Sequence, residues 1–219
     1  MKNYVIVFLF LTAFVFGSEA QTKPSIGIYY NPAYTGRITR ANSDLGWLEQ
    51  ESDLLESGSI GYSTGAFVEY ALSKKISVRG GAGFSNYAES IDSLNDFGID
   101  KYRNDYRFIE VPLALNYYIG KNENSRPYVS LGYTLNYFLN KRITYSLVGS
   151  NRDEKTVVKG ELNSISHAVR FAFGVDFILD KKWSVKTELF ANQFVSSLTN
   201  DGVRRLPFAA GLSVQLRKK

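Results

Sequence analysis

The chain has 219 residues, which is room for one β-barrel or β-sandwich, or for two small domains. A charged fraction of 21%, 18 Gly, 5 Pro and a mean hydropathy of -0.17 exclude a disordered or collagen-like chain. The lack of Cys excludes a disulfide scaffold, a thiolate metal site and a Cys nucleophile. Because there is only one His, most imidazole-based metal and acid–base chemistry is excluded too. We therefore expect no cofactor and no metal site.

Residues 1–20 have the pattern of a secretory signal peptide. Lys2 supplies a positive start, and residues 4–16 are apolar apart from Thr12. Small residues follow, which predicts cleavage before Gln21 and a mature barrel domain over 21–219. An uncleaved membrane anchor is the alternative, but the apolar run is short of the roughly 20 residues that span a bilayer.

The remainder of the chain alternates between apolar and polar or small residues with the period of a β-strand. In 164–179, for example, Phe171 and Phe173 fall on one face while Arg170 and Asp176 fall on the other. The pattern predicts eight strands, over 25–34, 59–72, 76–87, 106–119, 127–139, 164–179, 183–197 and 205–217. In the seventh of these, Phe190 and Phe194 fall on the polar face, which indicates either a bulge or aromatic filling of the interior.

Connections between these strands alternate in length. Residues 73–75, 120–126 and 180–182 form short turns, whereas 36–57, 89–104, 146–163 and 199–204 form the other, mostly longer, connections. Short turns on one side and long loops on the other are typical of an outer-membrane barrel. We predict an all-β fold, an eight-stranded antiparallel up-and-down transmembrane β-barrel in the cell outer membrane.

A soluble antiparallel sandwich or lipocalin-like barrel is the alternative, with the apolar face turned inward. The polar face favours the membrane barrel, because it carries small residues and isolated charges rather than many Lys and Glu. The predicted lumen charge network comprises Glu69, Arg79, Glu110, Arg170, Asp176, Lys186 and Glu188. An eight-stranded interior is just wide enough for side chains, so we expect these charges to neutralise one another as a structural plug. A proton or ion path is the functional alternative.

Aromatic side chains are expected in two belts at the membrane interfaces. The predicted interface aromatics are Tyr70, Tyr117 and Trp183 near the short turns, and Tyr62 and Tyr137, with Phe84 and His167, near the long loops.

The long loops are the expected working surface of the protein. Trp47, Leu48, Leu54 and Leu55 in loop 36–57 are the candidate contact for a protein partner. Basic residues expected outside the membrane suggest contact with lipopolysaccharide phosphates, although a solvated loop surface is the alternative. They are Arg37, Arg40, Lys141, Arg142, Arg152, Lys155, Lys159 and Arg204. Export and the mixed charge pattern argue against nucleic-acid binding.

His167 is the only imidazole, with Ser164 and Ser166 beside it. A lipid A-modifying enzyme would need Ser, His and an acid within hydrogen-bond reach. The strand register places His167 outward and Ser166 inward, so we expect no catalytic residues and no enzymatic activity.

Three strings resemble the PorT-like outer-membrane β-barrel domain family of Gram-negative bacteria, among the OmpA-like eight-stranded barrels. Residues 106–113 (YRFIEVPL) resemble its aromatic-x-x-Glu-hydrophobic-Pro-Leu strand, 126–133 (RPYVSLGY) its Pro-Tyr strand, and 78–85 (VRGGAGFS) its Gly-rich strand. The barrel and its long loops predict a structural or interaction role that supports secretion or envelope integrity through extracellular loops. The resemblance implies, by analogy, the role in secretion across the outer membrane. A narrow outer-membrane transporter or channel remains an alternative.

Overall fold

The computed structural model describes residues 23–40, 56–94, 99–120, 124–147, 153–160, 162–199 and 204–218. The expected signal peptide (1–20) and the proposed contact residues Trp47, Leu48, Leu54 and Leu55 lie outside the described residues. The described part forms nine strands: β1 (Ser25–Arg40), β2 (Glu56–Ala71), β3 (Ile76–Leu94), β4 (Ile99–Tyr118), β5 (Ser125–Leu147), β6 (Asp153–Val158), β7 (Ile165–Ile178), β8 (Trp183–Phe194) and β9 (Arg204–Lys218). No helix in these ranges is long and apolar enough to cross a membrane.

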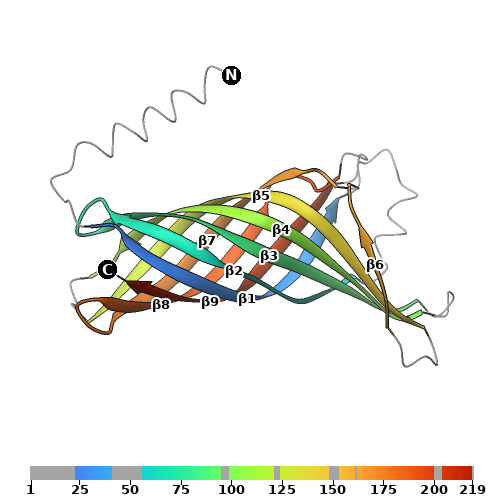
Figure 1. The fold of residues 1–219 in the computed structure, drawn as a ribbon, viewed down its shortest axis with the longest axis horizontal. Coiled ribbons are helices and arrows are strands. Elements are labelled where there is room, and N and C mark those ends of the chain that lie inside the picture. The colour runs from blue at the N-terminus through green and yellow to red at the C-terminus, as the bar shows by residue number, and fades with distance from the viewer. Residues whose placement is uncertain are drawn as a thin grey trace, which may run out of the picture.

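Eight of these strands close into an antiparallel barrel (Figure 1). Neighbouring strands follow one another around the wall, β9 returns to pair with β1, and β5 pairs with β7. The ninth strand, β6, pairs only with β5 among the described strands and stands outside the barrel wall. The predicted eight-stranded up-and-down barrel is therefore confirmed.

Apolar side chains face outward and polar ones face the lumen. Phe171, Leu115 and Leu212 are 59%, 49% and 55% exposed, whereas the charged side chains of Glu188 and Lys186 are buried. This arrangement is the reverse of a soluble barrel, so that alternative is wrong. Since closure pairs the backbone of every wall strand, the wall can face lipid without unsatisfied edges.

Strand β8 keeps its register past the point where the alternation changes. Phe190 pairs with Ala172 and Phe194 with Ala168, without a shift between them. Both phenylalanine rings are buried in the interior. The change of pattern is therefore aromatic filling of the lumen and not a bulge.

The expected loop 89–104 is mostly strand, and the expected loop 146–163 contains the end of β5 and the whole of β6, which corrects the prediction. Strands β3 and β4 pair as far as Leu94 and Ile99, and β5 pairs with β6 from Lys141 to Ser146. We call this four-stranded part, 86–94, 99–107, 140–147 and 153–158, the extension sheet. It reaches beyond the barrel wall at the right of Figure 1, opposite the short turns at 72–75 and 179–182.

Candidate functional site

The lumen near the short turns holds an ionic cluster centred on Glu69 of β2. Lys186 of β8 donates to both of its carboxylate oxygens at 2.8 and 2.6 Å, and Arg217 of β9 donates at 2.9 Å. Arg217 also bonds Asp176 at 2.7 Å, which in turn accepts from Arg126 at 2.8 Å. These bonds cross the barrel from one wall to the other, so they close its interior at this level.

A second ionic cluster surrounds Glu188 of β8. Arg79 of β3 and Arg170 of β7 donate to its two carboxylate oxygens at 3.0 and 2.8 Å. The hydroxyl of Tyr128 donates to the same carboxylate at 2.7 Å, and Arg79 also bonds Gln215. The structure thus brings six of the seven predicted lumen charges into two ion-paired groups, and adds Arg126 and Arg217.

Glu110 of β4 departs from this pattern. It is buried, it forms no ion pair with any described residue, and it accepts a hydrogen bond from the Tyr29 hydroxyl at 2.6 Å. The expectation that all seven charges neutralise one another is therefore wrong for Glu110. This carboxyl group lines a cavity of about 50 Å³ together with Asn31 and Asn192. Such a volume holds a few water-sized molecules and nothing larger.

At Glu188 and at Glu110, a tyrosine, an inward glycine and the glutamate lie in one row across neighbouring strands. Tyr128 pairs with Gly174, and Gly174 pairs with Glu188. A Cβ at Gly174 would lie 3.1 Å from Cζ of Tyr128 and 2.9 Å from Cγ of Glu188, so the tyrosine needs this glycine to cross its strand.

The row that ends at Glu110 is one strand longer. Tyr29 pairs with Gly65, which pairs with Gly83, which pairs with Glu110. A Cβ at Gly65 would lie 2.6 Å from the Tyr29 hydroxyl oxygen. Inward glycines therefore make room for tyrosine rings that orient the buried carboxylates.

The opposite half of the lumen is filled by packed aromatic rings. The ring centroids of Tyr87 and Phe194 are 5.0 Å apart, those of Tyr87 and Phe108 5.9 Å, and those of Phe108 and Phe138 5.7 Å. All four residues are buried, and Leu198 packs with them. Apart from Phe194, these plug residues were not predicted from the sequence, although Phe108, like Tyr106 before it, alternates with residues of the outward face.

Beyond this plug, polar groups gather at the mouth of the barrel. Glu89 accepts from the Tyr106 hydroxyl at 2.6 Å and from Asn104 at 3.0 Å, and lies 3.5 Å from Nε of Arg37. The Lys141 ammonium lies 5.7 Å from the centre of the Tyr106 ring.

Arg37 and Lys141 therefore face the barrel mouth, which corrects their assignment to the outer loop surface. Lys155, Lys159 and Arg204 are exposed, whereas Arg152 and the side chain of Arg40 lie outside the described part. Arg142 lies on the outer face of the extension sheet, opposite Asp105.

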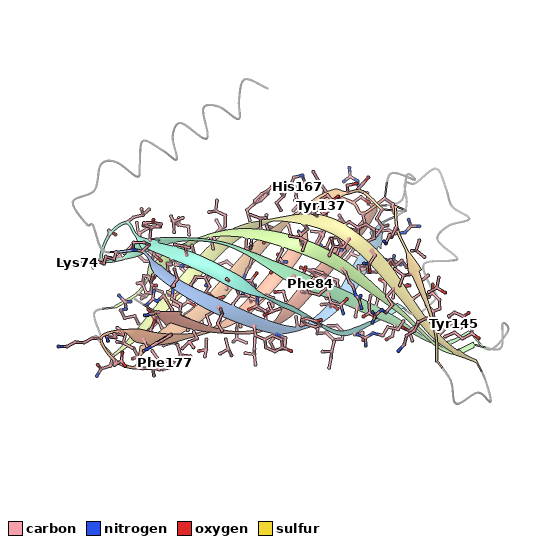
Figure 2. All side chains as sticks on the ribbon, viewed as in Figure 1. Lys74, Phe84, Tyr137, Tyr145, His167 and Phe177 are labelled. Atoms are coloured by element: carbon pink, nitrogen blue, oxygen red, sulfur yellow. The ribbon has the colours of Figure 1, made fainter. Side chains whose placement is uncertain are left out.

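The five predicted interface aromatics all lie on the outer wall. These exposed side chains are Tyr62, Tyr70, Tyr117, Tyr137 and Trp183. Figure 2 shows Phe84, Tyr137 and His167 toward the extension-sheet end of the barrel, away from Lys74 and Phe177 at the short-turn end. The rings of Tyr62 and Phe84 have centroids 6.2 Å apart.

The residues considered for catalysis do not come together. Ser166 is buried in the lumen, whereas His167 lies on the outer wall, where its Nδ1 bonds the Tyr133 hydroxyl. Within the described ranges, no three His, Cys, Asp or Glu side chains are placed to hold a metal ion.

A closed antiparallel barrel with an apolar outer wall and an ionic interior defines the class of outer-membrane barrel proteins. The model of the outer membrane protein beta-barrel domain family matches residues 6–214 of this chain. The chain therefore belongs to that family, and it resides in the outer membrane of a Gram-negative cell. No curated protein matches the sequence.

Several solved barrels are similar in structure to this chain. Neisserial surface protein A is 12% identical with a TM-score of 0.47, over 89% of this chain and 96% of that one. OprG from Pseudomonas aeruginosa is 13% identical with a TM-score of 0.44, over 88% and 94%. Ail, the attachment invasion locus protein of Yersinia pestis, is 14% identical with a TM-score of 0.38, over 89% and 99%.

Proposed function

We propose that this protein is a closed membrane anchor that holds the extension sheet outside the outer membrane as an interaction surface. The observation that carries this proposal is the contrast between a blocked lumen and strands that continue past the barrel. Glu69 and Glu188 bind cations from opposite walls, and aromatic rings fill the remaining interior. Outer-membrane barrels keep short turns in the periplasm, so the extension sheet would face the exterior.

We favour a structural, noncatalytic role for this anchor in the integrity of the cell envelope. The separation of Ser166 from His167 across the barrel wall supports a noncatalytic role over a lipid A-modifying one. The resemblance of residues 106–113 to the PorT-like family supports a contribution to secretion by analogy. The partners we propose are outer-membrane lipid, lipopolysaccharide and a protein at the extracellular side, with loop 36–57 as a further contact region.

A narrow transporter or channel is the second candidate. The cavity beside Glu110 is the feature of the described residues that favours it, but with about 50 Å³ this cavity is no continuous path. Because ionic bonds cross the lumen on one side of this cavity and aromatic rings fill the other, we favour the closed anchor.

A shortened extension sheet tests this function. Residues 92–101 can be replaced by Asn-Gly, because Ile91 pairs with Tyr102 and the two can flank a tight turn. Residues 147–152 can be replaced by Asn-Gly in the same way, because Ser146 pairs with Asp153. Such two-residue turns suit the twist of a hairpin. In cells that lack the protein, we expect the full chain to restore exclusion of vancomycin by the outer membrane. The shortened chain should fold, seen as heat-modifiable gel mobility, yet fail to restore exclusion; full restoration would contradict the proposal.

A further inference from the structure

We propose that the outer face of the extension sheet binds the phosphate groups of lipopolysaccharide in the outer leaflet, through Arg103, Arg107, Arg142 and Lys155. This inference rests on the proposed function in one respect, namely that the extension sheet faces the cell exterior.

The strand register places these four cations on one face. Arg142 pairs directly with Asp105, and Arg103 and Arg107 lie two residues to either side of Asp105 on β4. Thr144 pairs with Arg103 on one side and with Lys155 on the other. Directly opposed residues and residues two apart share a face of a sheet.

This shared face is the outer one. The alternate residues of β4, Asn104 and Tyr106, bond Glu89 at the barrel mouth, and Phe108 belongs to the aromatic plug. Since successive side chains point to opposite faces, Arg103 and Arg107 point away from the barrel axis.

The cations on this face outnumber its acids. Among the residues of this face whose side chains the structure describes, four cations against Asp105 leave a charge of +3 (4 − 1), and Arg103 lies 3.0 Å from Asp105. Arg103 is also held by Ser59 at 3.2 Å and by the carbonyl of Ile60 at 3.1 Å. Arg107, Arg142 and Lys155 form no ion pair with any residue that the structure describes. Arg103 is therefore bonded within the protein, whereas the other three cations have no ion-pair partner in the described part of the chain.

The height of this face fits a lipid phosphate rather than a soluble anion. Arg107 is two residues from Ile109, an outward apolar residue of the wall, which is about 7 Å along a strand. Tyr137 on β5 and Ile165 on β7, which pair with each other, are exposed at the same end of the apolar wall. Acyl chains can thus lie against the wall while their phosphate groups reach the cations. Arginine suits this contact because its guanidinium binds phosphate oxygens in a two-pronged manner.

The short-turn end of the barrel supplies a matched control. Lys74, Lys75 and Lys182 are exposed and lie at the end of the barrel opposite to Arg107, Arg142 and Lys155. Removing three charges at either end changes the net charge of the protein equally.

The test compares the variant R107Q/R142Q/K155Q with the variant K74Q/K75Q/K182Q, each as the full chain folded in detergent micelles. Arg103 is left in place because it bonds Ser59 and Ile60 of β2. The probe is purified lipopolysaccharide titrated into mixed micelles, with chemically dephosphorylated lipopolysaccharide and heparin as comparison ligands. Heat-modifiable gel mobility verifies that each variant is folded.

We expect the extension-sheet variant to bind phosphorylated lipopolysaccharide about a hundredfold more weakly than the unmodified chain, roughly fivefold for each cation removed. The short-turn variant should bind as the unmodified chain does, and dephosphorylated lipopolysaccharide should bind as weakly as it does to the extension-sheet variant. Equal binding by the two variants, equal binding of the dephosphorylated lipid, or equally tight binding of heparin would each overturn the proposal.

Failure of this test is distinguishable from failure of the proposed function. The shortened chain described above keeps all four cations, so it should bind lipopolysaccharide as the full chain does whether or not it restores vancomycin exclusion. If it instead loses lipopolysaccharide binding while folded, the assignment to these four residues is wrong.

Discussion

Arginine and lysine side chains are paired with carboxylates in the lumen, but most of those that the structure describes on the outer face of the extension sheet are not. Inside the barrel, Arg79 and Arg170 share Glu188, and Lys186 shares Glu69 with Arg217. On the outer face of the extension sheet, Arg107, Arg142 and Lys155 lack a carboxylate partner among the described residues. A charge removed from water must be compensated within the chain because desolvation costs several kcal/mol for each ion. A charge that stays in contact with water needs no partner within the chain, and it can bind an anion from outside.

The largest expected effect comes from removing a shared carboxylate in the lumen. Glu188→Gln removes the carboxylate that pairs with both Arg79 and Arg170, whose side chains are only 11% and 13% exposed. We expect the free energy of unfolding to fall by about 3 to 5 kcal/mol. Urea unfolding in detergent micelles, followed by gel mobility, measures this change. An effect within the error of the unmodified protein would show that Glu188 does not stabilise the two arginines through ion pairs.

A smaller effect is expected from filling one glycine of the row that ends at Glu110. A Cβ at Gly83 would collide with the Tyr29 hydroxyl, so Gly83→Ala should lower the free energy of unfolding by about 1 to 3 kcal/mol. Gly80→Ala is the control, because its Cβ would meet only Cδ1 of Leu113, at 3.8 Å. Equal stability of the two variants would contradict the placement of the Tyr29 side chain over Gly83.

A still smaller effect is expected at Glu110 itself. Glu110→Gln removes no ion pair, and the amide oxygen can still accept the Tyr29 hydrogen bond. The free energy of unfolding should change by about 1 kcal/mol or less. A loss as large as that of Glu188→Gln would mean that the carboxylate of Glu110 compensates a cation after all.

The smallest effect concerns an exposed pair on the extension sheet, where water surrounds both partners. The Tyr145 hydroxyl donates to the Glu154 carboxylate, which raises the pKa of Tyr145 above its ordinary value. Stabilisation by this pair is therefore complete below the unfolded-state pKa and lost as the pH rises through the folded-state pKa. Glu154→Gln should lower the pKa of Tyr145, measured by NMR with labelled tyrosine and assigned with Tyr145→Phe. An unchanged pKa would refute the contact.

The barrel itself could be predicted from the sequence because its two faces meet different surroundings. Wherever one face meets lipid and the other the lumen, apolar and polar residues alternate, as in Phe171 and Phe173 against Arg170 and Asp176. The same alternation is enough to place the lumen charges on the inner face, without knowledge of which strands pair.

The extension sheet could not be predicted because both of its faces are polar. Around Arg103, Asp105 and Arg107, charged residues still alternate with uncharged polar or aromatic ones, but apolar residues no longer mark one face. In β6 (Asp153–Val158) no alternation is left at all. A connection that carries charges in this way is easily taken for a loop.

The partners of the lumen charges could not be predicted either. Inward faces follow from the alternation, but which side chains meet across the lumen depends on how the barrel closes. Only the closed barrel brings Glu69 to Lys186, 117 residues further along the chain, and leaves Glu110 with a tyrosine instead of a cation.

The central claim is that ionic bonds across the lumen and packed aromatic rings leave no path through the barrel. Conductance of the purified, folded protein in planar lipid bilayers tests this claim most directly. We predict no steady single-channel conductance for the unmodified chain at either polarity of the voltage. A stable, reproducible conductance step would contradict the closed barrel and favour the channel.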